Sequence, residues 1–321
     1  MLKQILAVAL ASAFLAAASA SAQSSPQVVV ASQEEGARAI SARDEYLSTV
    51  TAGDVSIWLR RPGSGRDVDA LAQYLAGNVL PWSPEERARL DAMIARVSPR
   101  LADLAPWLPE RVQIARFRTE SSSGADFTRG DTIFLSSLKP TDDAMDERFF
   151  HELFHIISRS HEARRREFYA IVGFEVCTPL VLDDALRAHV LTNPDAPIVE
   201  YASQVQINNR TVWATPLMVA DLTRYTPRSD LFDHVELQFL ALSRDASGRC
   251  VADASSTLTQ AELGAAVVAR AGGNTNYVLH PEELVADNFA QMMMGRRDAP
   301  SPEVYSRLAT LLNIERPSTR E

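Results

Sequence analysis

Two histidines and a glutamate form the pattern best suited to chemistry in this 321-residue sequence. His151 and His155 are four residues apart, so on a helix they project from one face and their imidazoles can hold one cation. Glu152 would lie beside them, toward the open coordination position, and accept a proton from water. Two histidine nitrogens in a tetrahedral site suit Zn²⁺. We therefore predict a Zn²⁺ cofactor, with Glu152 as the general base.

The five-residue pattern is only moderately specific, because three fixed positions arise by chance in many chains. Phe149-Phe150 before it and Ile156-Ile157 after it indicate a buried helix. The alternative is an amphipathic helix whose two histidines have structural roles.

The third ligand would decide the family, and His161 is the first of three candidates. It extends the pattern to His151-Glu152-x-x-His155-x-x-Ser158-x-x-His161, which resembles the metzincin signature except that Ser158 replaces a glycine. That glycine allows a sharp turn, and no recognisable methionine turn follows. We expect His161 to lie exposed at the helix end.

Glu175 is the second candidate, twenty residues after His155, which is the spacing of thermolysin-like enzymes. In that family an aspartate follows the glutamate ligand by four residues on a helix, whereas position 179 here is Pro179. We expect Glu175 to be a surface or loop residue.

Glu283 is the third candidate, and its context fits. Pro281 is typical of the first position of a helix, which places Glu283 in the first turn and Asp287 one turn later on the same face. Glu283 would be the third metal ligand, and Asp287 would accept the outer N–H of a ligand histidine.

The segments 149–158 and 280–290 together resemble the gluzincins, in which a second helix carries E-x-x-x-D, often with alanine before the aspartate. The resemblance implies a zinc peptidase and names no substrate. The alternative for Glu283 is a solvated glutamate near a helix N-terminus, where the neighbouring Glu282 indicates that acidic residues are favoured.

A gluzincin-type site also needs a donor that stabilises the oxyanion formed on the substrate. Tyr277 and His280 precede the Glu283 helix, and we take them as candidate catalytic residues. The structural alternatives are that Tyr277 is a half-buried packing residue and that His280 is a helix cap. Less constrained candidates lie in the segment between the two helices: Tyr201, Tyr225 and His234.

The gluzincin resemblance also implies an edge strand before the active-site helix that pairs with the substrate backbone. Residues 131–135 are β-branched and aromatic beside a turn, so we predict one or two strands near them and place this edge there. The alternative is an ordinary strand whose edge the chain itself covers.

Residues 1–22 have the pattern of a secretory signal peptide, with Lys3, an apolar run and Ala20-Ser21-Ala22 as a cleavage site. An uncleaved N-terminal anchor is the alternative. We expect a bacterial periplasmic or secreted protein with no stable membrane anchor after cleavage. Export would also favour a disulfide between Cys177 and Cys250 over two buried free thiols.

The formal net charge of −9 argues against nucleic acid as a partner. We predict an α+β, mainly α-helical fold: a zincin-like catalytic core with an active-site helix, a small upstream β-sheet and a second ligand-bearing helix. Residues 23–115 would form a mainly helical N-terminal region. Residues 116–321 would form the metallopeptidase domain, with an irregular insertion at about 173–270, where prolines interrupt the pattern.

The sequence therefore predicts an exported zinc-dependent peptidase that cleaves peptide or protein substrates through a metal-activated water. One alternative is a non-catalytic zinc-binding envelope protein on a peptidase scaffold, although the intact Glu152 favours catalysis. The other is a zinc amidase that acts on cell-wall material by the same metal chemistry.

Overall fold

The computed structural model describes residues 26–226, 228 and 233–315. Helices account for 44% and strands for 20%, which confirms the α+β class. The signal peptide predicted at residues 1–22 lies outside the described residues. Within the described part, no helix is both long and apolar enough to cross a membrane.

Sheet A has five strands, in the order β1-β3-β5-β4 with β2 paired to β3. The strands are β1 (Gln27–Val30), β2 (Val79–Leu80), β3 (Arg111–Phe117), β4 (Phe127–Arg129) and β5 (Thr132–Leu135). β1, β3 and β5 run parallel, whereas β4 folds back antiparallel to β5. Of the one or two strands predicted near residues 131–135, two are present, β4 and β5. The expectation that residues 131–135 form the edge is wrong, because β4 covers β5 and is itself the edge strand.

Helices surround this sheet in the first half of the chain. They are α1 (Gln33–Ser41), α2 (Glu45–Thr49), α3 (Ala52–Trp58), α4 (Val68–Gly77), α5 (Pro84–Val97) and α6 (Thr119–Ser122), with the short 3₁₀ helices η1 (Ser98–Arg100) and η2 (Ala105–Trp107). The boundary predicted at residue 115 falls inside β3, so the two predicted regions share sheet A.

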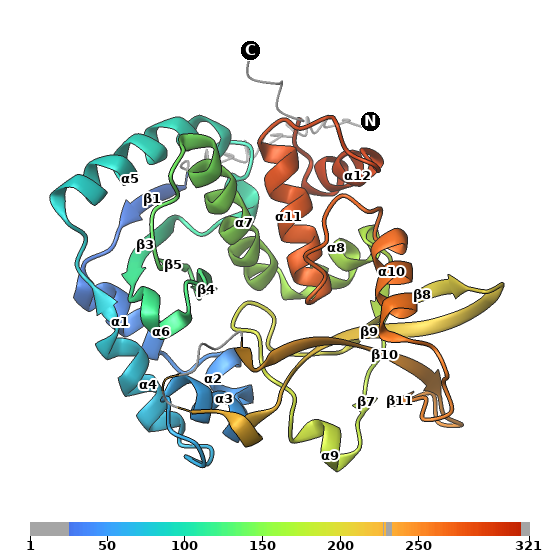
Figure 1. Ribbon diagram of the computed structural model, residues 1–321. Helices are drawn as coiled ribbons and strands as arrows, with labels where there is room; N and C mark the ends of the chain where they lie inside the picture. The colour runs from blue at the N-terminus through green and yellow to red at the C-terminus, as the bar shows by residue number, and fades with distance from the viewer. Residues whose placement is uncertain (1–25, 227, 229–232, 316–321) are drawn as a thin grey trace, which may run out of the picture.

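The second half contributes the long central helices. They are α7 (Asp142–Ser160), α8 (Arg165–Ile171), α9 (Asp184–Arg187), α10 (Gln260–Arg270), α11 (Pro281–Met293) and α12 (Glu303–Leu312), with η3 (Glu162–Arg164) and η4 (Leu222–Arg224). Figure 1 shows α7 and α11 side by side at the centre of the molecule. One hydrophobic cluster joins Val28 of β1 to Phe150 of α7 and Phe289 of α11.

Sheet B has six strands in the order β6-β8-β9-β10-β11-β7. They are β6 (Phe174–Val176), β7 (Leu180–Val181), β8 (Tyr201–Ile207), β9 (Arg210–Ala220), β10 (Val235–Arg244) and β11 (Cys250–Ala252). The prediction of an irregular insertion at 173–270 is therefore wrong. Pro216, which suggested irregular structure, lies within β9 opposite Phe239.

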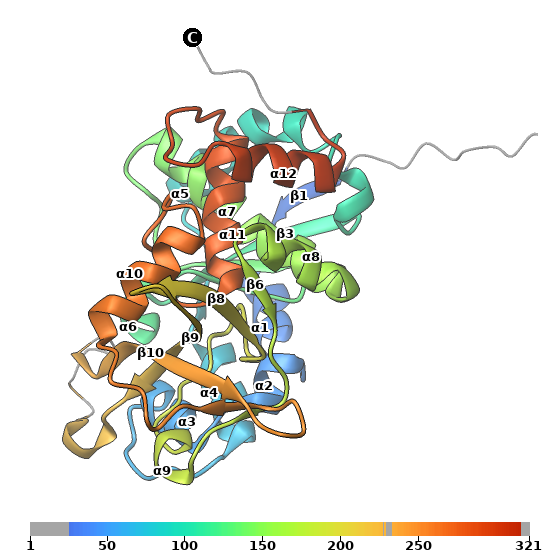
Figure 2. The same ribbon diagram turned by 90° about the vertical axis from the view of Figure 1, so that its right-hand side faces the viewer.

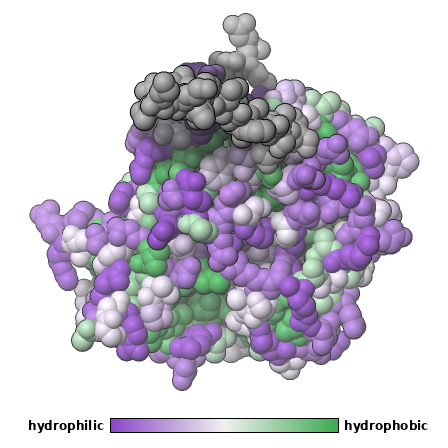
Figure 3. Space-filling view, turned by 180° about the vertical axis from the view of Figure 1, so that it is seen from behind, coloured by the Kyte–Doolittle hydropathy of each residue, from purple (hydrophilic) through white to green (hydrophobic). Residues whose placement is uncertain are grey.

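Sheet B is tied at one end by a disulfide between Cys177 and Cys250, whose Cα atoms are 5.6 Å apart. Figures 1 and 2 both place this sheet below the α7–α11 pair. The face shown in Figure 3 is mostly hydrophilic, with apolar residues in scattered patches.

Candidate metal centre

The first part of the site lies on α7, a helix that is buried through its middle. Its start is capped by Thr141, whose Oγ1 accepts from the Ala144 N–H at 3.3 Å. His151, Glu152 and His155 are 4%, 1% and 1% exposed, so water does not compensate their polar atoms.

The second part lies on α11, which begins at Pro281 as predicted. His280 caps this helix: its Nδ1 accepts from the Glu282 N–H at 3.1 Å, and its Nε2 donates to the Ile198 carbonyl at 3.2 Å. Burial lowers the pKa of His280 to about 4, which keeps the ring neutral in this role. Because both ring nitrogens are engaged, we assign His280 to the helix cap and not to oxyanion stabilisation.

The two helices bring His151, His155 and Glu283 together, with one ligand atom of each within 4.8 Å of the others. Nε2 of His151 lies 3.1 Å from Oε2 of Glu283, and Nε2 of His155 lies 3.7 Å from the same oxygen. Ligand atoms about 2.1 Å from a tetrahedral Zn²⁺ are separated by about 3.4 Å. The two observed separations bracket that value, so these buried residues can hold a metal ion.

A buried polar atom without a hydrogen-bond partner supports this fit. Nε2 of His155 is fully enclosed and has no hydrogen-bond partner, with Oε2 of Glu283 at 3.7 Å. Such an orphaned atom is rare in a folded protein and calls for an ion or a water molecule. It points to the position that a cation would occupy.

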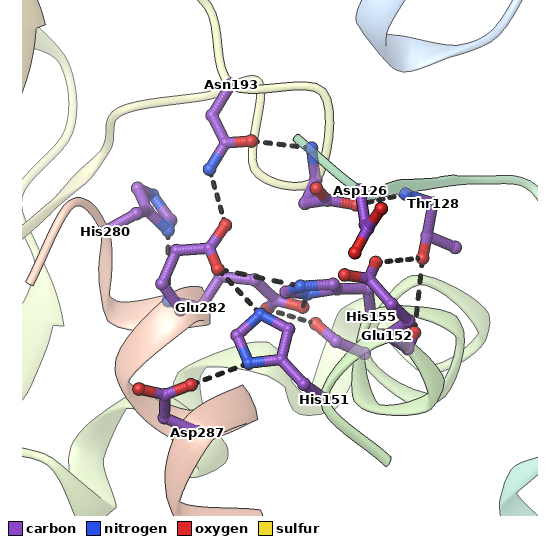
Figure 4. A network of polar contacts seen from close by, with 12 residues as sticks. Asp126, Thr128, His151, Glu152, His155, Asn193, His280, Glu282 and Asp287 are labelled. Atoms are coloured by element: carbon purple, nitrogen blue, oxygen red, sulfur yellow. Dashed lines mark hydrogen bonds and ion pairs between the residues drawn. The ribbon is translucent and has the colours of Figure 1, made fainter. Parts of the chain in front are cut away.

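Carboxylates hold the outer nitrogens of both histidines. Nδ1 of His151 lies 2.8 Å from Oδ1 of Asp287, as predicted for that residue, and Thr275 donates to the other Asp287 oxygen at 2.6 Å. Nδ1 of His155 lies 2.9 Å from Oε1 of Glu282. These contacts leave Nε2 of each ring for the metal position (Figure 4).

Glu282 is a site residue that the sequence reasoning missed. It is 1% exposed, and its Oε2 accepts from Ser158 at 2.7 Å and from Tyr169 at 2.6 Å. A signal was present, because Ser158 stands where the metzincin pattern has glycine and lies one turn after His155 on α7. The partner of that hydroxyl, however, is 124 residues away.

Glu152 lies on α7 and faces the edge strand β4. Thr128 of β4 donates its hydroxyl to Oε2 of Glu152 at 2.9 Å. Arg148, one turn earlier on α7, lies 3.4 Å from Oε1. These contacts fix the carboxylate beside the two histidines (Figure 4).

The neighbouring carboxylates raise the pKa values of both histidines. Burial lowers the pKa of His151, but hydrogen bonds to Asp287 and Glu283 outweigh it and raise the pKa to about 10. Burial likewise lowers the pKa of His155, and the charges of Asp195 and Glu283 raise it to about 9. The surrounding carboxylates therefore favour positive charge at this position.

A cavity of about 130 Å³ opens on Glu152 and Glu283 and is also lined by Trp58, Met218 and Tyr277. The Tyr277 ring lies 5.9 Å from the His151 ring. The charge of Glu283 and burial both raise the pKa of Tyr277, so its phenol stays protonated and can donate. Of the two predicted donors, the structure places Tyr277 in the cavity.

The other third-ligand candidates lie elsewhere. His161 ends α7, where its Nδ1 donates to the Ile157 carbonyl at 3.1 Å and its ring packs 4.8 Å from Trp107. Glu175 is exposed on β6. The alternative donors Tyr201, Tyr225 and His234 are not among the described residues that line the cavity.

Comparisons with protein-family models, with curated proteins and with solved structures found no match for this chain.

Proposed function

We propose that this chain is an exported zinc-dependent peptidase of the gluzincin type. The observation that carries the proposal is the convergence of two helices: α7 presents the Nε2 atoms of His151 and His155, and α11 presents the carboxylate of Glu283. Two histidines and one carboxylate are the donor set of catalytic zinc sites that keep a position open. The zincin-like core predicted from the sequence belongs to the same proposal, and sheet A with its antiparallel edge strand beside α7 supports it.

The proposed reaction is hydrolysis of a peptide bond. When bound, zinc supplies Lewis acidity, which makes water acidic near neutral pH and polarises a carbonyl group. Glu152 accepts the proton of the attacking water and delivers it to the leaving amine. Thr128 and Arg148 hold the Glu152 carboxylate in place during both transfers.

Tyr277 is the proposed donor to the oxyanion. It lines the cavity on the side of His151, and its protonated phenol can donate a hydrogen bond to a carbonyl oxygen that gains charge. Asp287 and Glu282 fix the tautomers of the two histidines, so that each Nε2 keeps its lone pair for the metal.

The proposed location is the bacterial periplasm or the exterior. The leader pattern at residues 1–22 and the disulfide between Cys177 and Cys250 support it, because disulfides persist in oxidising compartments. The proposed partners are peptide or protein substrates, with no nucleic acid, and no membrane anchor stays after cleavage.

Elemental analysis of the purified mature protein tests the metal site. We expect about one zinc per chain in the wild type and a sharp fall in Glu283→Ala. Retention of zinc in Glu283→Ala, with loss in His161→Ala, would favour the metzincin-like alternative. No zinc in the wild type after reconstitution would end the peptidase proposal.

Glu152→Gln tests catalysis separately from metal binding. The amide keeps the hydrogen bond from Thr128 but cannot accept a proton, so zinc content should stay unchanged while cleavage of a mixed peptide library is lost. Undiminished cleavage in this variant would remove Glu152 from the role of general base.

A further inference from the structure

A segment that follows α9 covers the metal centre. Residues 191–195 line the cavity together with the site residues. The segment is anchored at its start, because the Leu191 N–H donates to the Met218 carbonyl of β9 at 2.9 Å and the Thr192 N–H donates to Oδ1 of Asp54 at 2.9 Å. It is therefore held in place by sheet B on one side and by α3 on the other.

Two side chains of this segment reach into the site. Asn193 donates to Oε1 of Glu283 at 2.6 Å, as Figure 4 shows for its amide. The Asn193 oxygen also accepts from the Asp195 N–H at 2.9 Å, which fixes the turn between them. Oδ1 of Asp195 accepts from the Thr128 N–H of the edge strand at 2.7 Å.

Asp195 lies against the metal position itself. One oxygen of Asp195, one oxygen of Glu152 and one nitrogen of His155 lie within 4.8 Å of one another. The two groups share His155, so Asp195 lies next to the His151–His155–Glu283 centre, on the side of Glu152. Its carboxylate must move toward Nε2 of His155 to bind the same ion, since Nδ1 of His155 is held by Glu282.

The charges favour a cation between these groups. Asp195 and Glu152 are both carboxylates, and like charges this close repel unless a proton or a cation lies between them. Oδ1 of Asp195 is occupied by the Thr128 N–H, but a single ligand bond needs only the second oxygen. Carboxylate oxygens are ordinary zinc ligands.

We propose that Asp195 is a fourth ligand of the metal centre, supplied by residues 191–195, and that it must leave before a peptide is cleaved. This inference rests on the proposed function. Four protein ligands close a zinc site, whereas catalysis needs one open position. The resting protein is therefore inactive, because the Asp195 carboxylate takes the coordination position that catalysis needs.

The edge strand links the release of Asp195 to the binding of substrate. The Thr128 N–H that holds Asp195 belongs to β4, the edge of sheet A, and the Thr128 carbonyl accepts from Arg159 at 3.2 Å. An extended peptide that adds to this edge needs the same N–H. Its binding takes the donor away from Asp195, so an extended peptide long enough to pair with β4 is the substrate class that opens the site.

The test uses Co²⁺ bound to the full mature protein, because its visible absorption reports the number of ligands, with azide as an added ligand. Asp195→Ala removes the carboxylate. Asp195→Asn keeps an oxygen for the Thr128 N–H and so protects the fold. Asp184→Asn, the same substitution on exposed α9, is the matched control.

We expect both Asp195 variants to bind Co²⁺ about tenfold or more weakly. We also expect both to change their spectra with azide at concentrations that leave the wild type and Asp184→Asn unchanged. Peptide cleavage should begin without a lag in Asp195→Ala.

Co²⁺ affinity and an azide response in Asp195→Ala and Asp195→Asn within twofold of the wild type would overturn the inference and leave the peptidase proposal standing. Failure of the wild type to bind Co²⁺ or Zn²⁺ at all would instead defeat the peptidase proposal.

Discussion

At the residue scale, the division of labour between Glu282 and Glu283 explains how one helix turn completes the site. Successive residues on a helix point about 100° apart, so Glu283 faces both Nε2 atoms while Glu282 faces Nδ1 of His155. The proposed ligands and Asp287 were predictable, because residue spacing and helix-start signals are both read within a few residues of the chain. Glu282 and Asp195 were not predictable, because neither stands at a position that the helix spacing or the resembled motif marks as a site residue.

Glu282→Gln tests the role of the second glutamate. The amide keeps the size of the side chain but loses the charge that orients His155, so zinc affinity should fall by about 10- to 100-fold. Competition with a chromophoric chelator measures it. Glu303→Gln, an exposed glutamate in the first turn of α12, is the control; equal affinity in the two variants would make Glu282 a structural residue only.

Metal binding should depend on pH through the two ligand histidines. In the metal-free protein the pKa values of His151 and His155 are raised to about 10 and about 9, so both rings carry a proton at pH 7. A metal ion must displace these protons, and its affinity therefore rises with pH up to this range. Calorimetry in two buffers of different ionisation enthalpy should detect proton release at pH 7; heats that are independent of the buffer would contradict this assignment.

At the element scale, helix ends were more predictable than strand partners. Pro281 starts α11 as predicted, because this signal acts within one turn. One or two strands were predicted near residues 131–135, but the place of β5 between β4 and β3 in sheet A depends on pairing with β3, which precedes both strands in the sequence. Sheet B was not predicted, because its prolines interrupt the local strand pattern, although Pro216 itself lies within β9.

Arg129 should be a strong determinant of the edge strand. Its guanidinium is 1% exposed and binds Asp44 at the start of α2 through two contacts of 2.5 and 2.7 Å, which fixes β4. Arg129→Ala should lower the free energy of unfolding by about 3 kcal/mol, since it breaks a buried pair. Urea unfolding measures this loss.

The control for Arg129 is Arg111→Ala, whose pair with Glu35 is 49% and 30% exposed. That variant should lose much less stability, because solvent screens an exposed ion pair. Equal losses in the two variants would mean that burial does not strengthen the Arg129 pair.

At the scale of the whole molecule, the metal centre stands where two sheets meet. Sheet A supplies the edge strand, the segment anchored to β9 of sheet B supplies residues 191–195, and α7 with α11 supplies the proposed ligands. Composition and helix signals predicted the α+β class and the helix pair. The way in which sheet B closes over the site depends on contacts across the whole chain, such as Thr192 with Asp54, 138 residues apart, and no local pattern encodes it.

Removal of the disulfide should lower the stability of the protein without changing its zinc content. Cys177 and Cys250 close a loop of 73 residues, and the double variant Cys177→Ser/Cys250→Ser should lose up to about 4 kcal/mol of unfolding free energy in the chain-entropy account. The three proposed ligands on α7 and α11 lie outside this loop and only Asp195 lies inside it, so at saturating zinc the zinc content at room temperature should stay near the wild-type value. Thermal unfolding with and without reductant gives the check, because reductant should lower the Tm of the wild type and leave that of the double variant unchanged. Complete loss of zinc on reduction, below the unfolding transition, would mean instead that the ligands on α7 and α11 cannot hold zinc without the closed loop.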